Sequence, residues 1–314
     1  MTALICGSVA YDTIMVFQDR FKNHILPEQV HILNVSFLVP ELRREYGGCA
    51  GNIAYNLKLL GADPLPMATV GKDFTPYAQW LGYCGINQDF IKVLGDSYTA
   101  QAYITTDMDD NQITAFHPGA MSFSHLNRVP TDCGIRIGIV APDGKDGMVQ
   151  HAAQFAEAGI PFIFDPGQGM PMFDGQELLS FVELATWVTL NDYEAQLMQD
   201  RTGLAPEELA QRVEALIVTK GAQGSLIYAN GIRHEIPPAK PTAVLDPTGC
   251  GDAYRAGLIY GLLEEFDWPT IGRIASLMGA IKVETFGTQN HSFTLHAFKE
   301  RYRESFGCEL PDRI

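Results

Sequence analysis

The chain has 314 residues, 46% of them hydrophobic, so it is long enough to bury one large core and is not a disordered segment. Its formal net charge of −15 argues against nucleic acid or anionic membranes as partners, because both require clustered Lys and Arg. Six scattered cysteines, the lack of a basic signal-peptide start and the lack of a bilayer-length apolar run predict a reduced, cytoplasmic protein.

Short apolar runs alternate with helix-length segments along the chain. We predict strands at residues 4–6, 67–70, 135–141, 162–164, 187–190 and 215–218. We predict helices at residues 52–60 and 147–158, each followed by a glycine that can end a helix. Because buried strands that alternate with helices form βαβ units, residues 1–314 are expected to be a single α/β domain. It should have three layers, with a mostly parallel sheet flanked by helices.

Two stretches, residues 13–46 and 98–118, do not follow this alternation. In the second, residues 98–106 and 112–116 flank a turn rich in Asp and Asn. We expect both stretches to form extra β-structure inserted into the domain. It would make a small β lid over the crevice at the carboxyl ends of the strands, where α/β sheets bind ligands. Surface decoration is the alternative.

The most informative segment is D-P-T-G-C-G-D-A at residues 246–253, which precedes a predicted helix at residues 254–264. Gly249 and Gly251 allow the backbone to approach a ligand closely, and the free amides at a helix start can hold an anion. Asp252, in the first turn, can accept the proton of an attacking hydroxyl group. This combination suits phosphoryl transfer. An ordinary capped helix start is the alternative.

This segment resembles the D-x-x-G-A-G-D signature of the ribokinase-like (pfkB-type) carbohydrate and nucleoside kinases. The stretch G-G-C-A-G-N at residues 47–52 is similar to the family's G-G-x-x-x-N helix entry, and the resemblance extends from residue 4 to about residue 291. It implies a ribokinase-like fold and ATP as phosphate donor, with Asp252 as catalytic base. The implied anion hole consists of the amides of Gly249, Cys250 and Gly251.

Cys250 stands where the family normally has alanine. Its thiol adds little bulk, so we expect the amide contact and the activity to be retained. A thiol beside the reacting groups suggests the further hypothesis that the enzyme is sensitive to oxidation or alkylation.

For the acceptor sugar, the resemblance implies a site made of Asp12, Gly47, Gly48 and Asn52. A carboxylate can accept hydrogen bonds from two vicinal hydroxyls, and an asparagine adds a donor and an acceptor. The 2′ and 3′ hydroxyls of a ribose meet that need. By themselves, Asp12 could equally be a solvated loop acid and Asn52 a helix cap.

On the nucleotide side, the resemblance covers three stretches. The N-D-Y-E run at residues 191–194 is similar to an N-x-x-E motif, so Asn191 and Glu194 would organise Mg²⁺ and phosphate through water. The run T-K-G-A-Q-G resembles a T-x-G-x-x-G turn near the phosphates and ribose of ATP. Its matching residues are Thr219, Gly221 and Gly224.

The third stretch runs from Val283 to Gly287 and continues to residue 291; it would lie near the adenine of ATP. Many relatives bind a monovalent cation between this stretch and the loop of Asp246 and Thr248. The resemblance therefore implies K⁺ activation. Mg²⁺ would be the only essential metal, because the histidines lack the spacing of a zinc site.

The lid decides the acceptor. Residues 112–121 resemble the x-P-G-A-M stretch of bacterial and archaeal adenosine and nucleoside kinases. Phe116 with Met121 can supply an apolar wall for a base, or they can be lid core. D-P-G-Q at residues 165–168 resembles another stretch of this subset and places Gln168 near substrate or phosphate. Arg255, one turn after the base, would contact a phosphate or form a surface salt bridge.

Together these features predict an ATP-dependent nucleoside kinase that phosphorylates the ribose 5′-hydroxyl of adenosine or a related purine nucleoside. A sugar kinase of the ribokinase or fructokinase type, or a ligand sensor without catalysis on the same scaffold, is the alternative. The protein is expected to be a monomer, or a homodimer formed through the lid.

Overall fold

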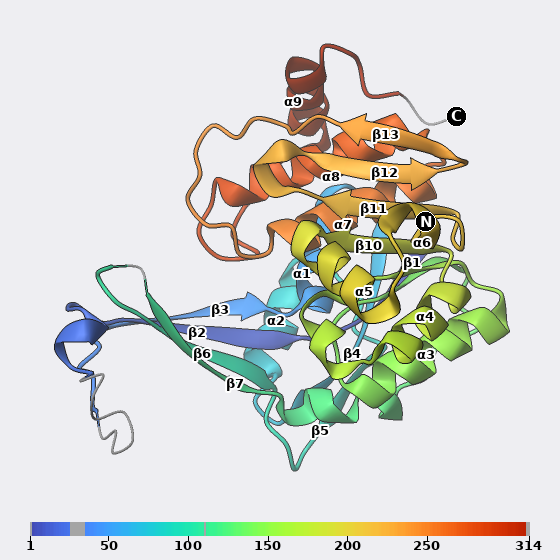
Figure 1. Ribbon diagram of the computed structural model, residues 1–314. Coiled ribbons are helices and arrows are strands. Elements are labelled where there is room, and N and C mark those ends of the chain that lie inside the picture. Colours follow the sequence, from blue (N-terminus) through green and yellow to red (C-terminus); the bar gives the residue numbers. More distant parts are fainter. Residues whose placement is uncertain (1, 26–34, 110, 312–314) are drawn as a thin grey trace.

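The main sheet of the protein has nine strands (Figure 1). The structure is a computed structural model that describes residues 2–25, 35–109 and 111–311. In sheet order the strands are β13 (Ile232–Ile236), β12 (Ser225–Ala229), β11 (Ala215–Thr219), β10 (Trp187–Asn191), β9 (Phe162–Phe164), β8 (Ile135–Val140), β1 (Thr2–Cys6), β4 (Asp63–Gly71) and β5 (Ile91–Leu94). Every neighbouring pair from β11 to β5 is parallel, whereas β12 and β13 are antiparallel additions. The predicted fold class and the six predicted strands are confirmed.

Helices cover both faces of this sheet. On one face lie α3 (Lys145–Ala158), α4 (Gly175–Leu184) and α5 (Asp192–Thr202); on the other lie α1 (Cys49–Leu59), α2 (Thr75–Tyr83), α7 (Cys250–Leu263) and α8 (Trp268–Val283), with α9 (Leu295–Phe306) beyond α8. Strand β1 faces both layers: Ala3 and Ile5 belong to one core cluster, Leu4 and Cys6 to the other. Burial on both faces explains why this strand is a continuous apolar run.

Short elements complete the connections: α6 (Pro206–Leu209) and the 3₁₀ turns η1 (Phe21–Asn23), η3 (Gly119–Leu126), η4 (Gly167–Met172) and η5 (Gly221–Gln223). Within the described ranges, no helix combines the length and the apolar character that crossing a bilayer requires.

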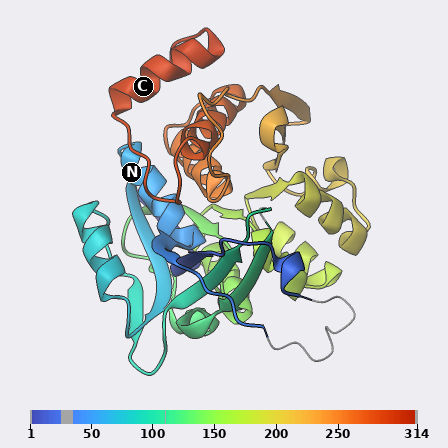
Figure 2. The same cartoon turned by 90° about the vertical axis from the view of Figure 1, so that its left-hand side faces the viewer.

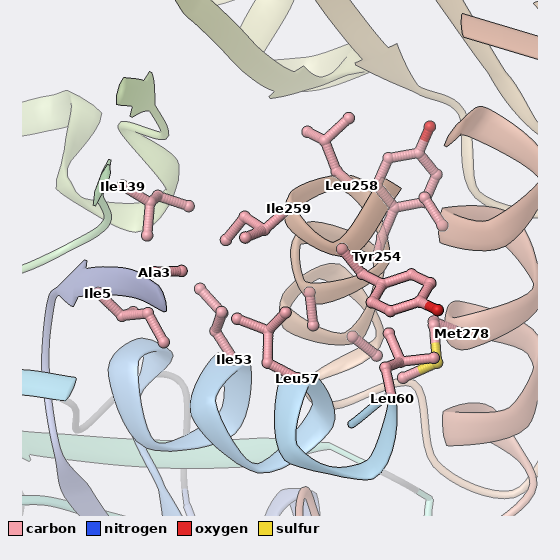
Figure 3. Packing of buried hydrophobic residues seen from close by; sticks show 14 of the residues in the cluster. Ala3, Ile5, Ile53, Leu57, Leu60, Ile139, Tyr254, Leu258, Ile259 and Met278 are labelled. Carbon is pink, nitrogen blue, oxygen red and sulfur yellow. The ribbon is translucent and has the colours of Figure 1, made fainter. Parts of the chain in front are cut away.

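One part of the hydrophobic core packs α1 against α7. Figure 3 shows Ile53 and Leu57 of α1 directed toward Leu258 and Ile259 of α7, and all four side chains are fully buried. Burying each such side chain contributes about 1.5–3 kcal/mol. This packing fixes the two helices relative to each other, and with them the glycine-rich segments at both helix starts.

A second sheet of four strands extends away from the main body (Figures 1 and 2). Its order is β3 (Glu41–Gly47), β2 (Ala10–Val16), β6 (Ala100–Thr106) and β7 (Gln112–His117). These strands arise from the two stretches predicted to be extra β-structure, and we call this sheet the lid sheet. Residues 26–34 of the first stretch and residue 110 of the predicted turn lie outside the described residues.

Candidate active site

Two helix N-termini meet at the site. Asn52, in the first turn of α1, donates a hydrogen bond from Nδ2 to Oδ2 of Asp252, in the first turn of α7, over 2.8 Å. Glycines begin both helices with positive φ, 85° at Gly48 and 78° at Gly249. A Cβ at Gly48 would lie 2.6 Å from a backbone carbonyl, so this turn accepts no larger residue without strain. The structure thus brings together the two motifs that the sequence identified separately.

Burial raises the pKa of Asp252 to about 6. The hydrogen bond from Asn52 and the positive charge of Arg255 act in the opposite direction, because both favour the ionised form, whereas the charge of Asp165 adds to the rise. A carboxylate with this pKa is mostly ionised at neutral pH and is a stronger proton acceptor than an ordinary aspartate. These are the properties that a general base requires.

The amides predicted to form an anion hole lie at the start of α7. The Cys250 amide donates to the Pro247 carbonyl over 3.1 Å, so it already has a partner inside the loop, whereas Gly251 is exposed beside Asp252. Burial raises the pKa of the Cys250 thiol to about 11, and the nearby acids add to the rise. A raised pKa disfavours the thiolate and so lowers the expected reactivity of Cys250, whose sensitivity to oxidation or alkylation stays a hypothesis.

Arg255 belongs to a buried ion network and not to the surface. Its Nε and Nη2 atoms donate to the two carboxylate oxygens of Asp165 over 3.0 and 2.9 Å, and Nη2 lies 3.9 Å from Glu194. Arg255 is 6% exposed and Asp165 is 3% exposed. The expectation of a surface salt bridge for Arg255 is therefore wrong, whereas a phosphate contact stays a prediction. The guanidinium fixes α7 to the segment that follows β9.

A chain of hydrogen bonds that the sequence did not predict orients Asn52. Gln289 donates from Nε2 to Oδ1 of Asn52 over 2.9 Å and to the Tyr77 hydroxyl over 2.6 Å. Trp80 donates to Oε1 of Gln289, and Tyr77 donates to the Gly47 carbonyl. Because Oδ1 of Asn52 is occupied by Gln289, its amide nitrogen is held toward Asp252.

Gln289 and His291 belong to a segment with buried side chains. We expected residues 288–291 to lie near the adenine of ATP, and this stays a prediction; the side chains of Gln289, 1% exposed, and His291, 3% exposed, point into the protein. His291 is hydrogen-bonded to Asn56 of α1 over 2.8 Å. Gln289 and His291 therefore both hydrogen-bond to asparagines of α1. The sequence alone could not predict these contacts, because the paired residues are more than 200 positions apart.

Asp12 lies on β2 of the lid sheet and not in a loop after the first strand, as its alternative interpretation assumed. A Cβ on Gly47 would lie 2.6 Å from its carboxylate, so a larger residue there would displace the Asp12 side chain. Burial raises the pKa of Asp12 to about 6, and the charges of Glu45 and Asp246 add to this rise. A hydroxyl donor would therefore find a carboxylate with few competing partners.

Phe116 shares a face of the lid sheet with Asp12. Asp12 is paired with Ala102 of β6, and Ala102 is paired with Phe116 of β7, so the three side chains form one row. Two strand spacings separate the ends of this row by about 10 Å. Phe116 is 53% exposed and is therefore not lid core. Gln168, in η4, is also exposed.

The predicted nucleotide-side residues occupy turns at the ends of β10 and β11. Asn191 and Glu194 form a capping box on α5, with hydrogen bonds of 2.7 Å and 2.8 Å between side chain and backbone. Burial raises the pKa of Glu194, and the charge of Asp165 adds to it. Gly221 and Gly224 have φ of 54° and 87° in the turn from β11 to β12. The turn connects the antiparallel strands β11 and β12 and begins after Thr219, which pairs with Ser225. It is therefore a hairpin turn, whether or not it also lies near ATP.

No cluster of three or more acidic, His or Cys side chains suited to a metal occurs within the described residues. Glu194 is a buried carboxylate with one face on its own helix cap. This arrangement fits contact with Mg²⁺ through water, as expected for an ion held mainly by phosphates.

The loop of Asp246 and Thr248 contacts the segment after α8. The Asp246 carboxylate accepts hydrogen bonds from the amides of Thr248 and Gly287, both over 2.9 Å. The Val283 carbonyl accepts from the amide of Asp246 over 3.1 Å. Between the two segments lies the ammonium of Lys282, bonded to the Asp246 carbonyl. A second cation beside this ammonium would be repelled by its charge, so these residues fit a bound K⁺ poorly.

Comparisons with known proteins identify relatives of this chain. The pfkB family carbohydrate kinase description matches residues 8–294. A nucleoside kinase from Methanocaldococcus jannaschii is 34% identical over 271 residues, which cover 85% of this chain and 89% of that protein. The structure of Burkholderia thailandensis nucleoside kinase in complex with inosine superposes with a TM-score of 0.89 at 51% identity, covering 98% of this chain and 99% of that one. The same nucleoside kinase in complex with ADP-inosine gives a TM-score of 0.87.

Proposed function

The chain belongs to the pfkB family of carbohydrate kinases, and on that basis we propose that it is a nucleoside kinase. It is a phosphotransferase with an alcohol group as acceptor, and it transfers the γ-phosphate of ATP to the 5′-hydroxyl of a purine nucleoside. The observation that carries this proposal is the contact of Asn52 with Asp252 where two glycine-rich helix starts meet.

In the proposed reaction, Asp252 takes the proton of the 5′-hydroxyl as its oxygen attacks the γ-phosphorus. The bond from the γ-phosphorus to the bridging oxygen breaks, and ADP leaves. Free amides at the start of α7, that of Gly251 among them, stabilise the charge on the phosphoryl oxygens. The pKa of Asp252, raised by burial to about 6, keeps the base ionised at neutral pH and basic enough to accept the proton.

The acceptor ribose is proposed to be held by Asp12 through its 2′ and 3′ hydroxyls, with Asn52 adding its amide. The row from Asp12 to Phe116 supports a nucleoside over a free sugar, because an exposed aromatic ring on a strand about 10 Å from the strand of Asp12 can cover the base of a nucleoside whose ribose Asp12 holds. The inosine complex of the Burkholderia thailandensis enzyme, 51% identical, supports a purine. Gln168, exposed in η4 after β9, is proposed to contact substrate.

The donor ATP is proposed to lie along the turns that follow β10 and β11, which contain Asn191, Thr219, Gly221 and Gly224, and near Val283 and Gly287. When bound, Mg²⁺ would neutralise charge between the β- and γ-phosphates. Glu194 would orient its water shell, and Asn191 keeps that carboxylate in place through the capping box. Six free cysteines support a reducing, cytoplasmic location.

The oligomeric state has two proposed alternatives. The face of the lid sheet opposite to Asp12 and Phe116 exposes Leu42, Tyr103 and Ile113, side chains that a second copy of the chain would cover. The protein is then either a homodimer formed through this face or a monomer. Light scattering of the wild type and of Tyr103→Lys separates them, because only a lid dimer would dissociate in the variant.

The function is tested by ADP release with Mg-ATP across inosine, adenosine, guanosine, cytidine, ribose and fructose. We expect turnover with purine nucleosides, and in Asp252→Asn a kcat lower by about 10²–10⁴ while nucleoside binding persists. Asp96→Asn, at an exposed acid, is the control. Turnover with a free sugar alone would favour the sugar kinase, and binding without any turnover would favour the sensor. Near-normal kcat in Asp252→Asn would remove this residue from the role of base.

A further inference from the structure

Lys282 is a buried lysine whose partners are backbone carbonyls. It lies in the last turn of α8 and is 0% exposed. Its Nζ donates to the Asp246 carbonyl over 2.8 Å and to the Thr285 carbonyl over 3.1 Å. A buried ammonium is costly unless its donors are satisfied, so these bonds are what allow the charge to remain inside the protein.

The two carbonyls belong to the two segments that adjoin the active site. Asp246 begins the loop that leads to Gly249 and the start of α7, whereas Thr285 lies in the turn after α8. The Asp246 carboxylate further ties these segments together by accepting from the Gly287 amide. The positive charge of Lys282 therefore lies between the loop that begins at Asp246 and the turn after α8 that contains Thr285.

Carbonyl oxygens from two loops are the kind of ligand that a monovalent cation uses, and a lysine ammonium is a compact single positive charge with three donors. Burial lowers the pKa of Lys282, while the Asp246 carboxylate favours its charged form. The two bonded carbonyls, over 2.8 and 3.1 Å, place that charge where the family resemblance implied a K⁺ ion. A separate cation at these carbonyls would lie against this positive charge and be repelled by it.

We propose that the Lys282 ammonium replaces a monovalent cation between the Asp246 loop and the turn after α8, so that the enzyme works without K⁺. Lys282 is then a positioning residue: it acts on Asp252 and the anion-holding amides through the Asp246 loop and does not contact substrate. This inference deepens the proposed kinase function and rests on it for the kinetic readout.

The first test compares wild-type kcat in chloride salts of K⁺, NH₄⁺, Na⁺ and tetramethylammonium at equal ionic strength. We expect values within about twofold of one another. Activation by K⁺ of fivefold or more over tetramethylammonium would overturn the proposal. If the wild type turned over no nucleoside, the proposed function would fail, while the thermal measurements below would still test the cation replacement.

The second test uses Lys282→Met, which keeps most of the length of the side chain and removes its charge, and Lys282→Ala, which also opens space. Lys240→Met, at an exposed lysine, is the matched control. In tetramethylammonium chloride we expect the Lys282 variants to lose at least tenfold in kcat, with nucleoside KM changed less. K⁺ or NH₄⁺ should restore part of that loss in Lys282→Ala and raise the Tm of the ligand-free variant.

A purely structural lysine gives a different result. If Lys282 only caps the end of α8, both variants lose stability and no cation restores activity or Tm, which overturns the proposal. Full activity of Lys282→Met in tetramethylammonium would overturn it as well. Should Lys282→Met fail to fold, the wild-type salt series and Lys282→Ala decide the matter.

Discussion

Replacing Asn52 by leucine tests whether its amide tunes the base. The substitution keeps the size of the side chain but removes the donor that lies 2.8 Å from the Asp252 carboxylate. A hydrogen bond to a charged group contributes about 1.5–3 kcal/mol. At about 1.4 kcal/mol per pKa unit, its loss should raise the pKa of Asp252 by about 1–2 units. From about 6, the pKa would move to about 7–8.

The consequence is a shifted pH dependence of kcat. A base with a pKa of about 6 is about 90% ionised at pH 7, whereas one at about 7–8 is only about 10–50% ionised. The acidic limb of kcat, measured at saturating substrates between about pH 5 and 9, should therefore move up by about 1–2 units in Asn52→Leu. Measuring kcat separates this effect from a loss of ribose binding, which would appear in KM.

The controls for Asn52→Leu address stability and specificity. Asn87→Leu, at an exposed asparagine, should leave the limb unchanged. The double variant with Asp252→Asn should lose no more kcat than Asp252→Asn alone, because the amide then has no base to tune. If the acidic limb of a folded Asn52→Leu enzyme stayed at the wild-type position, Asp252 would not be the group that titrates, and the assignment of the base would be wrong.

Three further changes probe the scaffold. Burial raises the pKa of Asp143 from 3.8 to about 8, so folding favours its protonated form and stability falls as pH rises from about 4 to about 8; Asp143→Asn should flatten the Tm over that range. Arg255→Met leaves Asp165 buried and unpaired and should cost about 3–5 kcal/mol in urea unfolding, recovered in part by adding Asp165→Asn. Gly48→Ala should destabilise more than Gly61→Ala, since both have positive φ but only the former meets backbone atoms within 4 Å; equal losses would show that the close approach is not the cause.

The main sheet was predictable because burial on both faces leaves a local signature. In β1, Ala3 and Ile5 face one helical layer and Leu4 and Cys6 the other, so the strand reads as an apolar run without alternation. The glycine-rich loops were predictable for a related reason. Gly249 has a positive φ, and a glycine just before a helix is a local signal of such a backbone conformation.

The support of the site was not predictable, because it depends on pairs that are distant in the chain. Gln289 reaches Asn52 across 237 positions, and Arg255 reaches Asp165 across 90. A glutamine or an arginine in a single sequence carries no sign of its partner. Lys282 was missed for the same reason, since its partners are carbonyls that every residue possesses.

Core packing and acid strength at this site have one physical origin. Ile53 and Leu57 hold α1 against Leu258 and Ile259 of α7, which places Asn52 beside Asp252 in the first turns of the two helices (Figure 3). The same close approach removes water from the carboxylate and raises its pKa.

Folding therefore gives up some stability at neutral pH, where the ionised acid is disfavoured, and obtains a stronger base in return. Asp12 follows the same logic on the lid sheet, since burial raises its pKa to about 6 as well. Sugar hydroxyls that donate to Asp12 would stabilise its ionised form, so binding energy from the acceptor offsets a cost that the empty site carries. The hydrophobic contacts between α1 and α7 thus determine both where Asp252 lies and how strongly it attracts protons.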